Sequence, residues 1–390
     1  MTSHSWFSTQ KDHGRVRVFF LGKKIFSYNA DKNFFTVNFY RRKNLLLNER
    51  NFLVSTQKKE IDCDKKILFI VHMLNSCGGM ESRILKYAEH LRKNGIEPYF
   101  LSTYNNSNPI LKNFTCFFLR FYDANFQECL FKLLQHKHFN CVEFHLFGNS
   151  PYFEKIDMQT LKASCRAGAT LHGSFRFPKE QLSKLDYCCL VTKFLDYDKP
   201  NRTVQPNGVN IQPPCWTYSG QRKALFVSRL DKEKLPTLRA FLDFCKKKHI
   251  SPEVAGPLSQ KPAAAIRTLI EQDYKKSVTF IGEIDTLSFL KDHPQDYLFV
   301  GGVGQVPLEA LSLGYPAFVC SHFGMEYSSF VTEDNFESLR LYNFVIRNNK
   351  GMFPVSQELP NGSTPPLPNE LLEKISFSSV VSEYRKIIQL

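Results

Sequence analysis

The chain has 390 residues, of which 43% are hydrophobic and 23% are charged, a balance that excludes an intrinsically disordered protein. This length is too great for one ordinary hydrophobic core and predicts two domains. The formal net charge of +14 favours an anionic partner, such as a membrane surface, a phosphorylated glycan or a nucleic acid.

The cysteines and the apolar runs predict a cytoplasmic protein. The 11 cysteines form no CxxC pair and no zinc spacing, which is typical of reduced, buried thiols. No apolar run reaches membrane-spanning length, and the polar first residues lack the apolar region of a signal peptide. We therefore expect no metal site, and at most a peripheral association with the inner face of the membrane.

Residues 1–62 predict a basic, aromatic β extension. They carry 12 Lys and Arg against 5 Asp and Glu. Residues 1–14 are expected to be disordered, and runs rich in Val, Phe and Tyr at 15–22, 24–28 and 33–40 predict a small β meander. The segment either docks on anionic lipid or glycan, or forms a solvated basic surface. No recognised nucleic-acid-binding motif accompanies it, so we expect no nucleic-acid partner.

Residues 63–213 predict the first α/β domain. The continuous apolar run 65–71 is typical of a strand that is buried on both faces of a parallel sheet. A helix is predicted over 80–95, where Ile84, Leu85, Ala88 and Leu91 recur at helical spacing. The β-α-β order predicts parallel strands with a right-handed crossover. Further strands are expected at 98–102, 114–119, 141–147, 169–173 and 187–192.

A second alternation of strands and helices occupies residues 214–375. The stretch 211–221, which contains two Pro and a Gly, is expected to link the two domains. A helix is predicted over 235–250, and a last helix over 376–390 is expected to return toward the first domain. The alternation predicts an α/β protein with two doubly wound, Rossmann-like domains that face a cleft. Strands are expected at 223–228, 253–256, 278–284, 297–301 and 316–320.

Three loops lie where a strand ends and a helix begins, which is where open parallel sheets bind ligands. In the first, CGGMES at 77–82, Gly78 and Gly79 let backbone approach a ligand beside the free amides of a helix start. Such an arrangement suits a phosphate. The alternative is that the two glycines only form a tight turn.

The second loop is SRLDKEK at 228–234, which carries the cations Arg229 and Lys234. Negative charge grows on a diphosphate as its bond to a sugar breaks, and two fixed cations lower the barrier to that step. The loop therefore predicts a site for a leaving diphosphate. The alternative is a charged surface loop without a ligand.

The third loop, within GGVGQVPLEALSLGYP at 301–316, contains Gly301, Gly302 and Gly304 and opens a helix that carries Glu309. Its backbone amides can hold a phosphate or nucleotide, and the Glu309 carboxylate can accept the two ribose hydroxyls. The alternative for Glu309 is an exposed residue near the favourable end of the helix dipole.

Together these segments resemble the retaining glycosyltransferases with GT-B architecture, a group that includes bacterial lipopolysaccharide and capsule transferases. The similarity runs from about Lys65 to the end of the chain, and the N-terminal meander resembles an extension of some lipopolysaccharide transferases. The similar segments are CGGMES, TLHGS (170–174), QPNGVN (205–210), SRLDKEK, VTFIGEI (278–284) and LEALSLGYP (308–316).

The resemblance implies roles for individual residues. Arg229 and Lys234 would hold the donor diphosphate, Glu309 would bind the ribose, and His172 would lie near the reacting sugar. His172 could donate a hydrogen bond to a sugar hydroxyl or phosphate, or it could be structural. The remaining implied residues are Gly301, Gly302, Gly304, Asn207 and Gly208 for the donor, and Gly78 and Gly79 for phosphate and acceptor.

The resemblance also implies an activity: metal-independent, hexosyltransferase-like transfer with retention from a nucleotide-sugar co-substrate, without another cofactor. The implied acceptor is a lipopolysaccharide, lipooligosaccharide or capsule-type glycan or glycolipid. The family commonly has a glutamate eight residues before Glu309, and this sequence has Gly301 there. Three rival interpretations are an inverting GT-B transferase, a nucleotide-sugar epimerase, and a non-catalytic GT-B scaffold or glycan-binding subunit.

Overall fold

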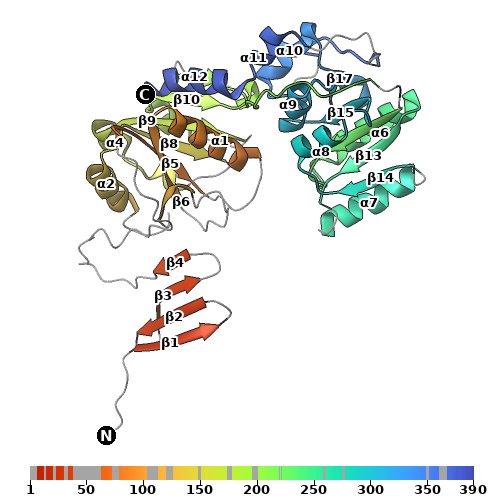
Figure 1. Ribbon diagram of the computed structural model, residues 1–390. Helices are drawn as coiled ribbons and strands as arrows, with labels where there is room; N and C mark the ends of the chain where they lie inside the picture. Colours follow the sequence, from red (N-terminus) through yellow and green to blue (C-terminus); the bar gives the residue numbers. More distant parts are fainter. Residues whose placement is uncertain are drawn as a thin grey trace. The chain divides into compact units, whose positions relative to one another are not determined.

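The computed structural model of the protein contains two compact units, which are described separately (Figure 1). The first unit extends to Cys189 and includes Lys199–Arg202 and Lys386–Leu390, and the second comprises Leu190–Asp198 and Thr203–Arg385. The structure describes residues 7–12, 15–20, 23–29, 34–37, 63–72, 79–102, 113–119, 126–147, 151–173, 178–195, 201–218, 220, 222–257, 261–274, 277–347, 351–359 and 367–390.

A four-stranded antiparallel sheet precedes the main body of the first unit and confirms the predicted β meander. The expectation that residues 1–14 are disordered is wrong for the first strand, which pairs from Phe7 opposite Phe20 to Asp12 opposite Arg15. This strand, FSTQKD, has a single apolar residue, so its pairing leaves no signal in local composition. The four strands are β1 (Phe7–Asp12), β2 (Arg15–Phe20), β3 (Lys23–Asn29) and β4 (Phe34–Val37).

The first unit is built on a seven-stranded sheet with the order β11-β10-β9-β8-β5-β6-β7. Strand β5 is parallel to β6 and β8, and the pairs β6–β7 and β8–β9 are also parallel, as the β-α-β pattern predicts. The strands are β5 (Lys65–Val71), β6 (Ile96–Ser102), β7 (Thr115–Phe118), β8 (Cys141–Leu146), β9 (Arg166–Leu171), β10 (Tyr187–Leu190) and β11 (Arg202–Val204). The helices between them are α1 (Gly79–Lys93), α2 (Phe126–Lys137), α3 (Pro151–Glu154), α4 (Met158–Ser164), α5 (Lys179–Ser183) and the 3-10 turn η3 (Lys193–Leu195).

Burial in the first unit follows the sequence pattern. Strands β6 and β8 are buried at every residue, and β5 is buried from Ile67 to its end. The four residues predicted at helical spacing in α1, from Ile84 to Leu91, are all buried. The helix ends at Lys93, and Gly95 adopts a φ of 75°, the left-handed conformation that glycine tolerates at a helix end.

The second unit is built on a six-stranded sheet with the order β14-β13-β12-β15-β16-β17, parallel except for the last pair. This is the second predicted Rossmann-like sheet. The strands are β12 (Lys223–Val227), β13 (Ser251–Ala255), β14 (Thr279–Gly282), β15 (Phe299–Gly302), β16 (Ala317–Val319) and β17 (Ser329–Phe330). The helices are α6 (Leu235–Lys248), α7 (Lys261–Asp273), α8 (Thr286–Asp292), α9 (Gln305–Ser312), the 3-10 turn η4 (Met325–Tyr327), α10 (Glu333–Leu341), α11 (Asn369–Glu373) and α12 (Phe377–Ile388).

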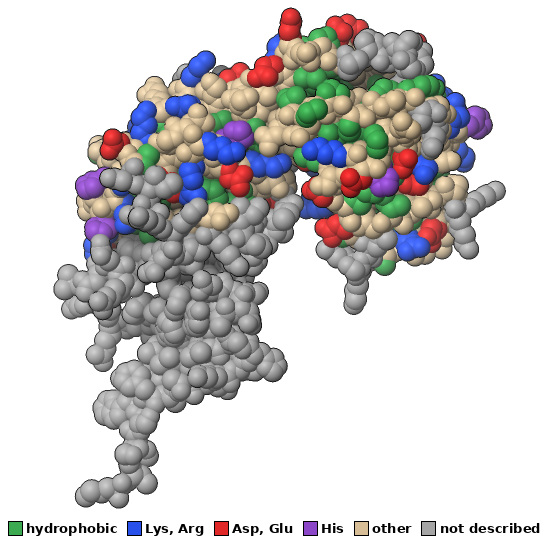
Figure 2. All heavy atoms as spheres, viewed as in Figure 1, with side chains coloured by type: hydrophobic (Ala, Val, Ile, Leu, Met, Phe, Trp, Pro, Cys, Tyr) green, Lys and Arg blue, Asp and Glu red, His purple; other side chains and the backbone are tan. Residues whose placement is uncertain are grey.

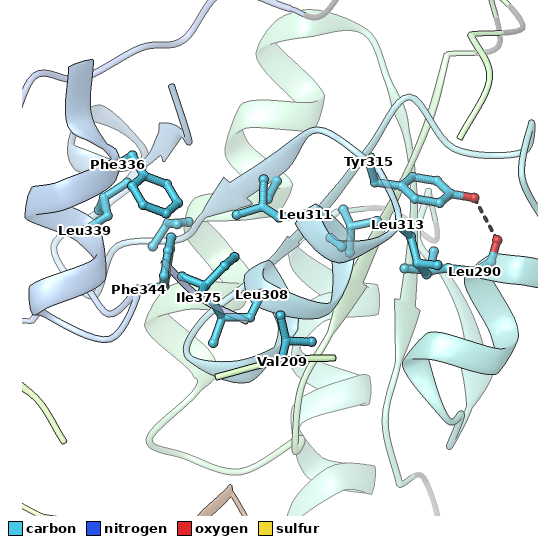
Figure 3. Close-up of a cluster of buried hydrophobic side chains, with 14 of the residues drawn as sticks. Val209, Leu290, Leu308, Leu311, Leu313, Tyr315, Phe336, Leu339, Phe344 and Ile375 are labelled. Carbon is cyan, nitrogen blue, oxygen red and sulfur yellow. Dashed lines mark hydrogen bonds between the residues drawn. The ribbon is translucent and has the colours of Figure 1, made fainter. Parts of the chain in front are cut away.

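Both faces of this second sheet are buried. Neighbouring residues of a strand join different hydrophobic clusters: Leu225 belongs to one and Phe226 to the other, as do Val300 and Phe299. Figure 3 shows the first cluster, where α9 packs through Leu308 and Leu311. The second cluster contains six phenylalanines in ring contact, so the sheet is sandwiched as the continuous apolar strands predict.

The segment that was expected to link the domains is bonded to the second unit. The amide of Gln212 donates to Ser312 O at 3.2 Å, and the amide of Cys215 donates to Leu313 O at 2.9 Å. Trp216 Nε1 donates to Tyr297 O at 3.0 Å. Thus residues 211–218 run against α9 and the chain before β15.

The residues before this segment pair with the chain just before α12. The amide of Val209 donates to Ile375 O at 2.8 Å, and the amide of Phe377 donates back to Val209 O at 2.9 Å. From Lys386, near the end of α12, the last residues belong to the first unit, where Arg166 Nη2 donates to Ile387 O at 3.0 Å. The segment that leads into the second unit is therefore hydrogen-bonded to the segment that leads out of it.

The ten cysteines that the structure describes form no disulfide bonds with one another, and most of them are buried. Within the same described ranges, no helix combines the length and the apolar character that crossing a bilayer requires.

Candidate functional site

The loop after β12 forms a compact turn that leads directly into α6. Its Asp231 carboxylate accepts a hydrogen bond from the amide of Lys234 at 3.1 Å, and Lys234 is the N-cap residue of α6. Arg229 projects outward with 69% of its side chain exposed, and its Nε lies 3.7 Å from Asp231 Oδ2. A contact of this length at the surface contributes little stability, so Arg229 remains available to another anion.

Lys234 is the more buried of the two predicted cations. Burial lowers the pKa of its ammonium, and the positive charge of Arg229 lowers it further. Both effects disfavour the charged form, because the ammonium loses water and faces a second cation. An anion bound between Lys234 and Arg229 would remove that disadvantage, which is the electrostatic property expected of a phosphate site.

Arg347 adds a third cation to this group, and the neutral ring of His322 lies beside it; sequence reasoning missed both. The positive charge of Arg347 lowers the pKa of Lys234 and also that of His322. Burial and then Lys234 lower the pKa of His322 to about 4. Its Nδ1 lies 3.3 Å from Ile346 O, so the ring donates there and its buried Nε2, which has no hydrogen-bond partner, carries the lone pair.

These side chains meet because of the sheet topology. Arg229 follows β12 and His322 follows β16, two parallel strands on either side of β15. Arg347 follows a parallel bridge between Ser321 and Ile346, which places it beside His322. The carboxyl ends of the strands therefore gather the four side chains Arg229, Lys234, His322 and Arg347 at one edge.

The glycine-rich loop lies at the same edge. An added Cβ at Gly302 would lie 2.7 Å from Val306 Cγ1 and 3.2 Å from Val227 O, so Gly302 lets the ends of β12 and β15 approach closely. Gly304 has a φ of 66°, which an L side chain rarely adopts, and its amide donates to Phe344 O at 2.9 Å. The amide of Gly304 is thus occupied within the protein, and the helix start begins at Gln305.

Gly301 faces the hydrophobic core. It lies within β15 and is buried, and an added Cβ would lie only 2.5 Å from Cδ2 of Phe241. A side chain here would point into the packed phenylalanines and away from the loop. A glutamate eight residues before Glu309 therefore has no room in this chain unless Phe241 moves.

Asn207 and Gly208 lie next to the start of α9. Gln305 Nε2 donates to Gly208 O at 3.3 Å, and the amide of Asn207 donates to Asn343 Oδ1 at 3.0 Å. Glu309 stands one turn into α9 and is half-buried. The structure thus brings Asn207, Gly208, Gly302, Gly304 and Glu309 around one helix of the second unit.

Gly256 is a further residue of this edge that sequence reasoning missed. Its amide donates to Gly282 O at 2.7 Å, and an added Cβ would lie 2.3 Å from Ser228 O. The loop that carries Arg229 therefore passes so close to the end of β13 that only glycine fits. The glycine that ends the segment EVAG (253–256) was the available signal.

In the first unit, the predicted residues are His172 and the two glycines. Gly78 lies outside the described residues. Gly79 begins α1, is exposed, and has no atoms within 4 Å of an added Cβ. His172 follows the end of β9 and is half-buried, and its Nε2 lies 3.0 Å from Nδ1 of His145.

His172 belongs to a buried polar group that sequence reasoning missed. Glu143 and His145 occupy alternate positions of β8 and are both almost fully buried. Glu143 Oε1 accepts from Thr170 Oγ1 at 2.5 Å, and Oε2 accepts from Tyr187 OH at 2.8 Å. A glutamate and a histidine two residues apart within the apolar run CVEFHLF were the available signal.

Both histidines of this group are held neutral. Burial lowers the pKa of His145 to about 3, and the nearby Arg83 on α1 adds to the effect. Burial also lowers the pKa of His172 well below its usual value, with further contributions from His145 and Arg83. At neutral pH each ring therefore carries one proton and one lone pair, and can both donate and accept.

On the face shown in Figure 2, neither unit is covered by side chains of one charge, because Lys and Arg occur together with Asp and Glu. Among the residues that the structure describes, no three His, Cys, Asp or Glu side chains come together as a metal site would require. Within the basic segment 1–62, the structure describes only the backbone of strands β1–β4.

Comparison with known proteins places this architecture in the GT-B fold. No protein-family model matches the chain, and no curated protein matches its sequence. A lipopolysaccharide outer core galactosyltransferase, WaaB, is similar over 83% of this chain and 99% of its own, with a TM-score of 0.57 and 13% identity. A variant of S. aureus TarM bound to fondaparinux, α-GlcNAc-glycerol and UDP covers 84% and 100%, with a TM-score of 0.52 and 12% identity. An α-glucosyltransferase bound to UDP and a 13-mer DNA covers 84% and 100%, with a TM-score of 0.51 and 13% identity.

Proposed function

We propose that the protein is a glycosyltransferase that moves a sugar, with retention of configuration, from a nucleotide-sugar donor to a glycan or glycolipid. One observation carries the proposal: Arg229 and Arg347 both act electrostatically on Lys234, and the order of β12, β15 and β16 brings their loops to one edge of the second sheet beside His322. An enzyme that expels a nucleoside diphosphate needs positive charge at the point where the leaving phosphate becomes anionic.

The residues of the proposed donor site have different roles, which follow from the chemistry of their side chains. Arg229 and Arg347 offer planar donors to the phosphate oxygens, and Lys234 supplies a compact charge beside them. The open helix start at Gln305 adds backbone amides, and the Glu309 carboxylate accepts the ribose hydroxyls. Because these cations neutralise the diphosphate, we propose that the transfer is independent of a metal ion.

Bond making and bond breaking occur on one face of the sugar. The bond between the anomeric carbon and the phosphate oxygen breaks, and the electron pair leaves with the diphosphate. The acceptor hydroxyl forms the new bond from the same side and passes its proton to the departing phosphate oxygen. The product then keeps the anomeric configuration of the donor.

The acceptor class rests on the fold relatives and on charge. WaaB is named for lipopolysaccharide outer core, and TarM was solved with glycan ligands and UDP. By analogy, we propose a lipopolysaccharide, lipooligosaccharide or capsule-type acceptor at the cytoplasmic face of the membrane, with the basic residues 1–62 docking on anionic lipid. A DNA acceptor is an outcome to be tested, since one relative was solved with DNA.

The test is a binding and transfer screen on the full chain. Thermal shifts are measured with UDP-, GDP-, ADP- and CMP-sugars for the native protein, Arg229→Ala and the control Lys232→Ala, an exposed lysine of the same loop. We expect one nucleotide class to stabilise the native protein and the control but not Arg229→Ala. Transfer to glycan, glycolipid and DNA acceptors is followed by NMR of the product's anomeric centre.

The screen also separates the rival activities. Inversion of the anomeric centre would indicate an inverting transferase, and conversion of the free nucleotide sugar would indicate an epimerase. Stabilisation by a glycan without any donor binding would indicate a non-catalytic glycan-binding subunit. Absence of stabilisation by every donor would overturn the proposal.

A further inference from the structure

The buried group in the first unit contains a chain of neighbouring polar side chains that ends at His172. Glu143 Oε1 lies 3.5 Å from Nε2 of His145, which makes no hydrogen bond, and Nδ1 of His145 lies 3.0 Å from Nε2 of His172. Glu143 and His145 lie within β8, and His172 follows β9, the adjacent parallel strand. His172 is the member nearest the solvent, because it is half-buried while the other two are almost fully buried.

The direction of the protons along this chain follows from the carboxylate. Two hydroxyl groups, from Thr170 and Tyr187, already donate to Glu143, so its oxygens act as acceptors. A lone pair on His145 Nε2 would face a carboxylate oxygen in a buried environment, where such repulsion is strong. The proton of His145 therefore resides on Nε2, and its Nδ1 presents a lone pair.

The lone pair on Nδ1 of His145 determines the tautomer of His172. With Nδ1 of His145 as acceptor, the 3.0 Å contact requires a proton on Nε2 of His172. A neutral His172 ring then has no proton left for Nδ1. We propose that Glu143 and His145 are positioning residues that select this tautomer of His172, so that Nδ1 accepts a hydrogen bond from a hydroxyl group of the ligand.

The proposal assigns a ligand chemistry to this edge of the first sheet. An accepting nitrogen favours an alcohol hydroxyl, such as that of a sugar, over a deprotonated phosphate or a carbonyl oxygen. This differs from the expectation that His172 donates a hydrogen bond. The identity of the hydroxyl as one of a sugar rests on the proposed function, whereas the tautomer rests only on the buried group.

Other charged and titratable groups around the chain are consistent with this assignment. Arg83 on α1 acts on both rings and opposes their protonation. Cys189 on β10 lies near Glu143, and burial raises the pKa of its thiol, so it stays neutral. Neither group supplies a competing carboxylate that would draw the His145 proton to Nδ1.

The experiment reads the tautomer directly. The full chain is labelled with ¹⁵N-histidine, and the His172 signals are assigned by their loss in His172→Gln. We expect an unprotonated Nδ1 and a protonated Nε2 for His172 at neutral pH. A protonated Nδ1 in the native protein would overturn the inference, and this result does not depend on any variant or on activity.

One variant should reverse the proton positions on both His145 and His172. In Glu143→Gln an amide N–H can face His145 Nε2, which would move the His145 proton to Nδ1 and the His172 proton from Nε2 to Nδ1. We expect His172 to change tautomer in Glu143→Gln and not in the matched control Tyr187→Phe, which removes a hydroxyl from the other carboxylate oxygen. An unchanged tautomer in a folded Glu143→Gln protein also contradicts the proposal.

Transfer kinetics separate this inference from the proposed function. If transfer is observed, Glu143→Gln should lower kcat/KM at least about tenfold, and Glu143→Asp, which restores a carboxylate, should recover part of the loss. If no donor or acceptor supports transfer, the proposed function fails while the tautomer measurement still decides this inference.

Discussion

The ammonium of Lys234 lowers the pKa of the His322 imidazole, although the two residues lie 88 positions apart in the chain. They meet because Lys234 opens α6 after β12, and His322 follows β16, which is separated from β12 by one strand. The pair marks the electropositive edge of the second sheet and shows that the site extends beyond the loop SRLDKEK.

Removing either predicted cation should impair turnover strongly. Arg229→Ala and Lys234→Ala should each reduce kcat by on the order of a hundredfold, the scale of losing one preorganised electrostatic contact. Lys232 is an exposed residue of the same loop, so Lys232→Ala should keep a kcat close to that of the native protein. Steady-state transfer assays decide this, and near-native rates in both Arg229→Ala and Lys234→Ala would refute the assignment.

Arg347→Ala should weaken donor binding by about tenfold, because it removes one of the three cations of the proposed diphosphate site, where Arg347 acts on Lys234. Arg239→Ala is the matched control, since Arg239 in the same unit pairs with Asp273 at 2.7 Å on the surface. Calorimetric titration with the free nucleoside diphosphate measures the effect. Equal affinity in the native protein and Arg347→Ala would remove Arg347 from the site.

A glutamate in place of Gly301 should destabilise this protein. Gly301→Glu must displace Phe241, and overpacking of this kind lowers the free energy of unfolding by about 1–3 kcal/mol or more. Gly79→Ala, where an added Cβ meets open space, is the control and should change stability by less than about 0.5 kcal/mol. Thermal melts compare the two, and a fully stable, more active Gly301→Glu would show that the packing argument is wrong.

Gly256→Ala should act on the site through the backbone. The added Cβ would lie 2.3 Å from Ser228 O, so the loop that carries Arg229 has to shift. We expect a loss of donor affinity that exceeds any loss of thermal stability. A variant with native affinity would mean that the loop position is unimportant for binding.

Acid should destabilise the first unit through its buried histidines. The pKa of His145 is about 3 in the folded protein and 6.5 in its usual environment, so between these values the unfolded chain binds more protons. The free energy of unfolding therefore falls as pH drops below 6.5, by up to about 1.4 kcal/mol per pH unit for this residue. Denaturation at pH 7, 6 and 5 should show a smaller loss in His145→Gln, and an unchanged loss in the exposed control His136→Gln.

Much of the fold could be predicted because its signals are local. The run 65–71 became β5 at Lys65–Val71, and the helix expected at 235–250 became α6 at Leu235–Lys248. Continuous apolar strands that alternate with amphipathic helices leave few arrangements other than two covered parallel sheets. Strand β1 was missed because its pairing with β2 compensates for a polar composition.

The candidate site could be predicted only in part. The loop with Arg229 and Lys234 was found because both cations lie in one short segment. Arg347 and His322 were missed because only the order of β12, β15 and β16 brings them to that loop. Spacing alone could not show which face of β15 Gly301 lies on, since that depends on the packing of Phe241.

The reciprocal hydrogen bonds between Val209 and the chain at Ile375 and Phe377 have an evolutionary consequence. Because the two ends of residues 209–377 are hydrogen-bonded to each other, the stretch between them forms a self-contained insert, the arrangement in which modules are most readily exchanged or permuted.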